Sequence, residues 1–144
     1  MTPTIQQILM GVGAALSAPP PPEAAGDFNA SKVGMIGMMS MLAAQEADKA
    51  IPVRVAENAA IRLVLRRAAG TTYDAEFAGR ISAAVDQTDE MLTISALDAA
   101  NADLRRLLTD LHASVEASGD REFDHAILRL YRDMAEGRRL EFGR

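Results

Sequence analysis

The sequence predicts an all-α protein, an antiparallel bundle of about four long helices with an N-terminal helical arm and no sheet. Apolar residues recur three and four positions apart along most of the chain, which is the period of an amphipathic helix. Neither strand alternation nor an Asn-Gly hairpin turn interrupts that pattern. Short connections between such helices favour antiparallel neighbours. With 144 residues, 49% of them hydrophobic, the chain can bury one aliphatic core.

The N-terminal region predicts an arm over residues 1–17, a proline-rich linker over residues 18–27 and the bundle over residues 28–144. Pro3 suits the first turn of a helix, and apolar residues follow it at helical spacing. The run Pro19–Pro22 cannot continue a helix and favours a stiff, extended connector. We therefore expect the arm to dock on the body or on another subunit.

The next helix is expected over residues 29–49, and its segment 33–44 is apolar on every face. A helix of that kind lies centrally or at a subunit interface. Small residues would let a neighbouring backbone approach, and methionines are adaptable fillers. An ordinary core helix explains the segment. The functional hypothesis is a pliable binding groove or an interface formed by its methionines, which are Met35, Met38, Met39 and Met41.

The remainder of the chain predicts four further helices. Pro52 is expected to break or kink the chain and to start a helix over residues 52–69. The others are expected over residues 75–92, 96–117 and 121–136. Because no Gly or Pro separates the first two of these, a single continuous helix is the alternative, and the run Thr93–Ser95 argues for a break.

Composition excludes several classes of function. The formal net charge is −5 and acidic residues interleave with the arginines, so nucleic acid is not an expected partner. No polybasic run would hold an anionic membrane, and the longest apolar run is too short to span one. The absence of cysteine excludes disulfides, thiol catalysis and Cys-ligated zinc, and it suits a cytoplasmic protein. We expect no cofactor.

An internal echo places two Asn–Arg pairs four residues apart on helices. Asn58 precedes Arg62, and Asn101 precedes Arg105, within similar Ala- and Leu-containing surroundings. Residues four apart share a helix face, and an arginine fork beside an amide can clamp a carboxylate or phosphate. The pairs are thus candidates for an anion-binding site, with structural pairing to neighbouring acids as the alternative.

The two histidines raise the question of a metal site. Glu122 and His125 match half of a di-iron bundle motif, but the second Glu-x-x-His that such sites need is absent. The residues that come nearest to a mononuclear ligand set are His112, Glu116 and His125. We therefore predict no metal. No motif of acid–base or nucleophilic chemistry is present either, and no catalytic residue is predicted.

The run Arg54-Val-Ala-Glu-Asn-Ala59, together with the opening Pro3-Thr-Ile5, resembles a family of small bacterial all-helical proteins of unknown function. Members of that family tend to be encoded beside acyl-CoA dehydrogenase-like and phosphotransferase-like proteins. The resemblance covers about a third of the chain. It implies an accessory role and supplies no catalytic residues.

These observations predict an interaction or accessory protein that self-associates, most simply as a twofold dimer, with a further protein partner as an option. One alternative is a protein that binds a small anionic or acyl ligand. A second alternative is a small metal-dependent enzyme. Enzymatic activity is left open, and the interaction class ranks first because no motif supplies chemistry.

Overall fold

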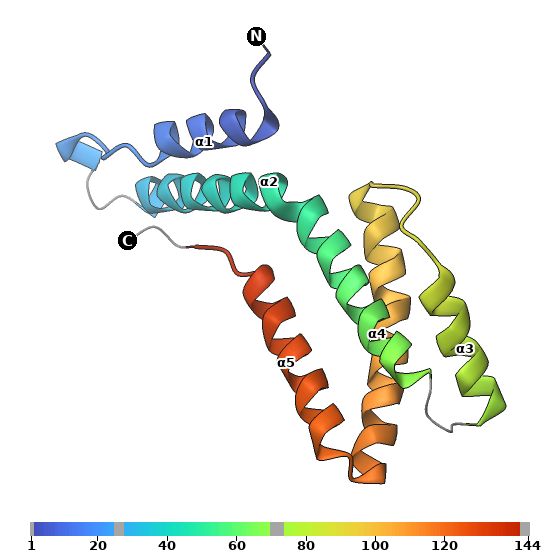
Figure 1. Ribbon diagram of the computed structural model, residues 1–144. Helices are drawn as coiled ribbons and strands as arrows, with labels where there is room; N and C mark the ends of the chain where they lie inside the picture. Colours follow the sequence, from blue (N-terminus) through green and yellow to red (C-terminus); the bar gives the residue numbers. More distant parts are fainter. Residues whose placement is uncertain (1, 25–27, 70–73, 142–144) are drawn as a thin grey trace. The chain divides into compact units, whose positions relative to one another are not determined.

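The computed structural model describes residues 2–24, 28–69 and 74–141 (Figure 1). Within these ranges the chain forms helices and no strand, which confirms the all-α prediction. A short 3-10 turn lies at Pro22–Ala24. The α-helices are α1 (Ile5–Leu16), α2 (Phe28–Ala68), α3 (Ala75–Asp86), α4 (Ile94–Ser118) and α5 (Arg121–Gly137). None of the described helices is both long and apolar enough to cross a bilayer.

The chain divides into two compact units, and the division falls inside α2. Residues 1–50 and 140–144 form one, here called the hairpin unit, and residues 51–139 form the other, here called the bundle unit. The hairpin unit thus joins the expected arm to the first part of the expected bundle. Its C-terminal segment is held by two hydrogen bonds of 2.8 Å, in which the Gln45 amide donates to the carbonyl of Glu141 and accepts from its N–H.

Helix α2 runs without a break through Pro52, so the predicted break between residues 49 and 52 is wrong. Proline lacks the N–H that would bond to the carbonyl of Asp48, and inside a helix it costs about 3 kcal/mol. That cost is offset because the residues after Pro52 are packed: Ile61 and Leu65 are fully buried in the bundle. Tertiary packing outweighs the local propensity here.

The bundle unit consists of the second part of α2 followed by α3, α4 and α5, each antiparallel to the one before it (Figure 1). Its core is aliphatic apart from Phe77 and Phe123. The turns carry the signals that the sequence contains. Asp120 caps α5 by accepting a 3.0 Å bond from the Phe123 N–H, and Gly119 ends α4 with a φ of 76°, where glycine avoids the clash of a Cβ.

Helix α3 ends at Asp86, six residues before the predicted end, and α4 is a separate helix. The segment that follows is not helical, and in it Asp89 forms an ion pair with Arg62 of α2. Thr93 then caps α4 by accepting a 3.3 Å bond from the Ala96 N–H. A break between the two helices is therefore confirmed, but it lies at residues 87–93 rather than over the Thr93–Ser95 run, of which Ile94 and Ser95 already belong to α4.

Candidate functional site

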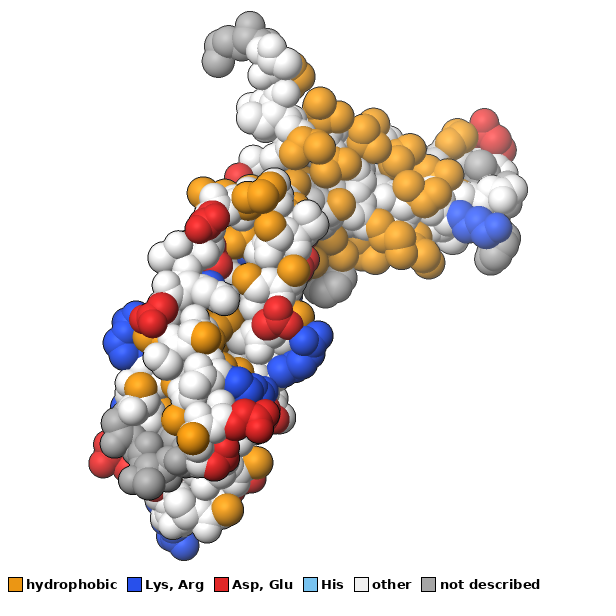
Figure 2. Space-filling view, turned by 90° about the vertical axis from the view of Figure 1, so that its right-hand side faces the viewer, with side chains coloured by type: hydrophobic (Ala, Val, Ile, Leu, Met, Phe, Trp, Pro, Cys, Tyr) orange, Lys and Arg blue, Asp and Glu red, His pale blue; other side chains and the backbone are white. Residues whose placement is uncertain are grey.

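The hairpin unit buries no large apolar side chain among its described residues. Its buried positions are Gly13, Gly37, Ala44 and Ala50. Large apolar residues instead lie between 42% and 66% exposed along both helices. They are Ile5, Ile8, Met10, Val12, Val33, Met35, Ile36, Met38 and Met39. On the face that Figure 2 shows, apolar side chains gather in the upper part of the view. A pair of helices that exposes its largest apolar side chains lacks the usual source of helical stability.

Backbone contact explains this arrangement. A Cβ atom added at Gly37 would lie 3.0 Å from the carbonyl oxygen of Gly13 and 3.1 Å from the amide nitrogen of Ser17. The Ser40 hydroxyl also donates a 2.8 Å bond to the carbonyl of Leu9. The helices therefore meet through glycines and one side chain–backbone bond, and Met41 packs against Gly13 at the crossing. The exposed apolar side chains flank the crossing and face outwards.

The exposed apolar residues of α1 and of residues 33–45 of α2 form stripes that contain no charged residue. Helix α1 contains no charged residue, and α2 contains none between Lys32 and Glu46. Ile5, Ile8 and Val12 recur at helical spacing and share one face of α1. Of the methionines predicted as an interface, Met35, Met38 and Met39 are about half exposed, and Met41 is half-buried beside Gly13.

The polar residues singled out by the sequence echo enter a buried network in the bundle unit. The Arg62 guanidinium donates from both Nη atoms to the Asp89 carboxylate, at 3.1 and 2.8 Å. Asn58 donates to the same carboxylate at 3.2 Å. The hydrogen bonds from Arg62 make the largest contribution, and together with the bond from Asn58 they hold the pKa of Asp89 below its usual range.

Asn101 extends the network towards α5. It donates to Asn58 Oδ1 at 2.9 Å and to Glu57 at 3.2 Å. Arg138 closes the far end with two 2.7 Å bonds to Glu57, which raise the pKa of the arginine. Arg105, the fourth residue of the echo, is exposed and is not part of this network. Because each arginine of the network meets a carboxylate of the chain, the contacts favour structural pairing over ligand capture.

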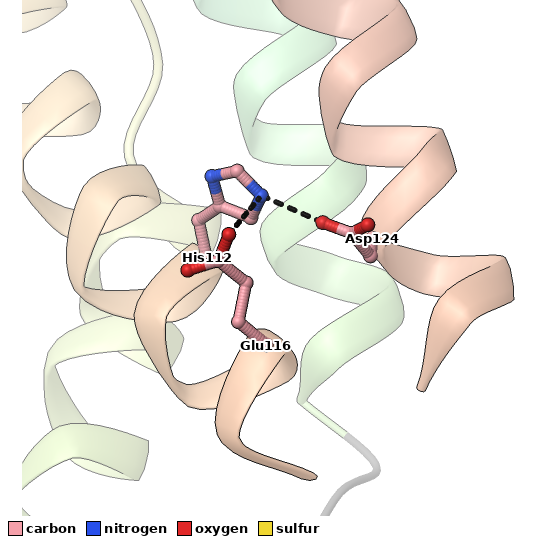
Figure 3. Close-up of side chains that lie close together, drawn as sticks. All are labelled: His112, Glu116 and Asp124. Atoms are coloured by element: carbon pink, nitrogen blue, oxygen red, sulfur yellow. Dashed lines mark hydrogen bonds and ion pairs between the residues drawn. The ribbon is translucent and has the colours of Figure 1, made fainter. Parts of the chain in front are cut away.

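A second polar cluster joins α4 to α5 (Figure 3). His112 Nε2 lies 2.8 Å from Asp124 Oδ1 and 3.9 Å from Glu116 Oε1. One ligand atom from each of the three residues lies within 4.8 Å of the others. His125, named from the sequence, is exposed and lies outside the cluster. The sequence analysis missed Asp124, because its approach to His112 depends on how the turn at Gly119 and Asp120 aligns the two helices.

Two cavities of the bundle unit border these polar groups. One of about 330 Å³ is lined by residues of α3 and α4 and by Arg62, and it includes Arg80 and Arg106. Another of about 300 Å³ lies at the α4–α5 turn, where Glu116 and Asp124 form part of its wall. Both volumes are at the lower end of what small-molecule sites enclose.

Comparison with known proteins yields no relative: no family model, no curated protein and no solved structure matches the chain.

Proposed function

We propose that the protein is an interaction protein that self-associates through the hairpin unit, as a twofold dimer in which the hairpins of two copies pack together. The proposal rests on the burial pattern of that unit, in which small residues are buried and large apolar residues are exposed. Its buried positions are glycine and alanine, whereas its Ile, Val and Met side chains are about half exposed. Covering those side chains supplies the apolar burial that the hairpin lacks by itself.

The exposed surface suits a second copy of the same chain. Nine side chains that are each about half exposed together present on the order of 800 Å². That area is an upper limit for one contact, because residues two positions apart lie on different faces of a helix, and it equals what one partner contributes to an interface of standard size. A twofold interface brings each patch onto its own copy, so any charge in it would meet a like charge. The hairpin avoids that repulsion because its exposed stripes are uncharged.

A lipid surface is a less suitable partner. Helices that lie in a membrane interface carry Lys and Arg along their polar face, and α1 carries none. Glu23 also lies in the 3-10 turn that follows α1, so a hairpin that entered lipid by this end would bury a carboxylate.

The test is the molar mass of the full chain by light scattering during size exclusion. We expect a dimer for the wild type and a monomer for Ile36→Glu, which places a charge on the apolar surface of α2. Leu63→Glu is the matched control, since Leu63 is 63% exposed on the same helix but belongs to the bundle unit. A monomeric wild type, or a control that dissociates equally, would contradict the proposal; a wild type that floats with phosphatidylcholine vesicles as a monomer would replace it with membrane binding.

Binding of a small anionic ligand remains the second candidate, because Arg62, Arg80 and Arg106 line one cavity. Arg80 and Arg106 pair with the half- to mostly exposed carboxylates of Asp110 and Asp103, and exposed pairs of this kind contribute only about 0–1 kcal/mol. An anion could therefore displace them. Calorimetric titration with butyrate, compared between the wild type and Arg80→Ala, tests this candidate. The accessory role implied by the family resemblance and the cytoplasmic location are further parts of the proposal.

A further inference from the structure

We propose that His112, Glu116 and Asp124 form a binding site for one divalent first-row metal ion of the zinc class. The site lies wholly in the bundle unit and does not depend on the hairpin. Imidazole and carboxylate groups together suit such ions, and three protein ligands leave a coordination position for water or a further ligand.

The distances from His112 Nε2 to the two carboxylate oxygens lie just below and just above the ligand–ligand distance expected in a metal centre. Ligand atoms held at about 2.1 Å from a tetrahedral zinc ion lie about 3.4 Å from one another. His112 Nε2 is 2.8 Å from Asp124 and 3.9 Å from Glu116, so each distance changes by about 0.5 Å on binding. Glu116 is 64% exposed and can make this adjustment by rotating its side chain. The ion would replace the hydrogen bond at Nε2, which requires the imidazole proton to lie on Nδ1.

The charges of the cluster favour a cation. In the described part of the bundle unit, the buried carboxylate of Glu57 and the half-buried carboxylate of Asp89 each pair with an arginine. Asp124 is also largely buried, with 25% of its side chain exposed, yet the ion pairs within the described residues give it only His112. Two carboxylates and one imidazole therefore share this site, and no Lys or Arg side chain of the described residues forms an ion pair with either carboxylate.

The local fold fixes the ligands and leaves room beside them. His112 and Glu116 are four residues apart on α4 and so share its face. Asp124 projects from the first turn of α5, which Gly119 and Asp120 connect to α4. The cavity of about 300 Å³ at this turn is bordered by Glu116 and Asp124 and can hold a metal-bound water. Arg121 also lines it and forms no ion pair with either carboxylate in the described chain.

The competing explanation is a histidine that only links two helices by a hydrogen bond to Asp124. That link needs neither Glu116 nor a metal. Substituting Glu116 therefore separates the two explanations, because a metal site loses a ligand whereas the helix–helix bond persists. Glu116 is exposed enough that Glu116→Gln should leave folding intact.

The experiment is calorimetric titration of chelator-stripped full-length protein with Zn²⁺, together with the visible absorption of bound Co²⁺. We expect one ion per chain for the wild type, and an affinity at least about tenfold weaker for both His112→Ala and Glu116→Gln. His125→Ala is the matched control, because His125 is an exposed histidine one position from Asp124 and should change neither signal.

Two results would overturn the inference. The first is that the wild type binds Zn²⁺ no more tightly than His112→Ala, while circular dichroism shows that both proteins are folded. The other is an equal loss of affinity in His125→Ala, which would mean that ions attach to surface histidines without a defined site. A Co²⁺ spectrum that changes in Glu116→Gln but not in His125→Ala would support it.

Discussion

Replacing Gly37 by alanine tests the glycine crossing on which the hairpin depends. The added Cβ would lie 2.7 Å from Ser17 Oγ, 3.0 Å from the Gly13 carbonyl oxygen and 3.1 Å from the Ser17 amide nitrogen. The hydroxyl can rotate away, but the other two atoms belong to the backbone. The helices must therefore separate by several tenths of an ångström, or α1 must shift along α2.

The expected magnitude comes from two opposing effects. Overpacking of a close contact costs about 1–3 kcal/mol. Alanine in place of glycine inside a helix returns about 1 kcal/mol. The net loss for the α1–α2 contact is then about 1 kcal/mol, and RT ln 10 of about 1.4 kcal/mol converts this to an approximately fivefold faster amide exchange in α1.

Gly34→Ala is the matched control, because Gly34 lies one turn before Gly37 on the same helix. A Cβ added there meets nothing within 4 Å, so only the gain in helix propensity remains. Hydrogen exchange followed by mass spectrometry should therefore show faster exchange in α1 for Gly37→Ala and equal or slower exchange for Gly34→Ala. If both alanines slow the exchange equally, the close crossing is refuted.

Three further predictions concern the bundle unit. The ion pair with Arg62 lowers the pKa of Asp89 in the folded protein below the value of 3.8 for the unfolded chain. The ion pair therefore stabilises the folded state fully above pH 3.8, and this stabilisation is lost as the pH falls through the lower pKa of the folded state. Urea unfolding should therefore show a stability advantage over Asp89→Asn at pH 7 that shrinks in acid. Arg138→Ala leaves Glu57 buried without its cation and should cost about 3 kcal/mol in the same assay, whereas exposed Arg105→Ala should stay within about 0.5 kcal/mol. Gly119→Ala strains a residue at φ 76° and should cost about 1 kcal/mol, measured by thermal unfolding.

The sequence predicts the fold class because the helical period and the turn residues act locally. Gly119 and Asp120 end one helix and cap the next without help from distant residues. Pro52 shows where such reasoning fails: the local penalty for proline in a helix is real, but the buried residues after it determine the outcome. Asp89 shows the converse, since an ion pair with Arg62 accompanies the early end of α3.

The candidate sites were predicted only in part, for a related reason. The echo brought Asn58, Arg62 and Asn101 to attention, and these three do meet. Their carboxylate partners lie on other segments, so no spacing rule could show that the chain itself neutralises them. Likewise, His112 and Glu116 share a helix face and were paired from the sequence, whereas Asp124 comes from the next helix.

The dependence of the hairpin on a second copy leads to a final prediction. Helices α1 and α2 meet through glycines, so covering their outer apolar faces must provide much of the stability of the hairpin. By mass action, that stability rises with protein concentration, whereas the bundle unit has its own core around Leu108 and Leu111. Amide exchange in α1 should therefore slow as the concentration is raised, up to dimer saturation, and exchange in α4 should stay constant. The comparison uses wild-type protein over the range of concentrations in which light scattering detects a change of mass. If amide exchange in α1 does not change over that range, the dimer contact lies elsewhere. Ile36→Glu should remove the dependence on concentration without altering α4, because it blocks association and leaves the bundle core untouched.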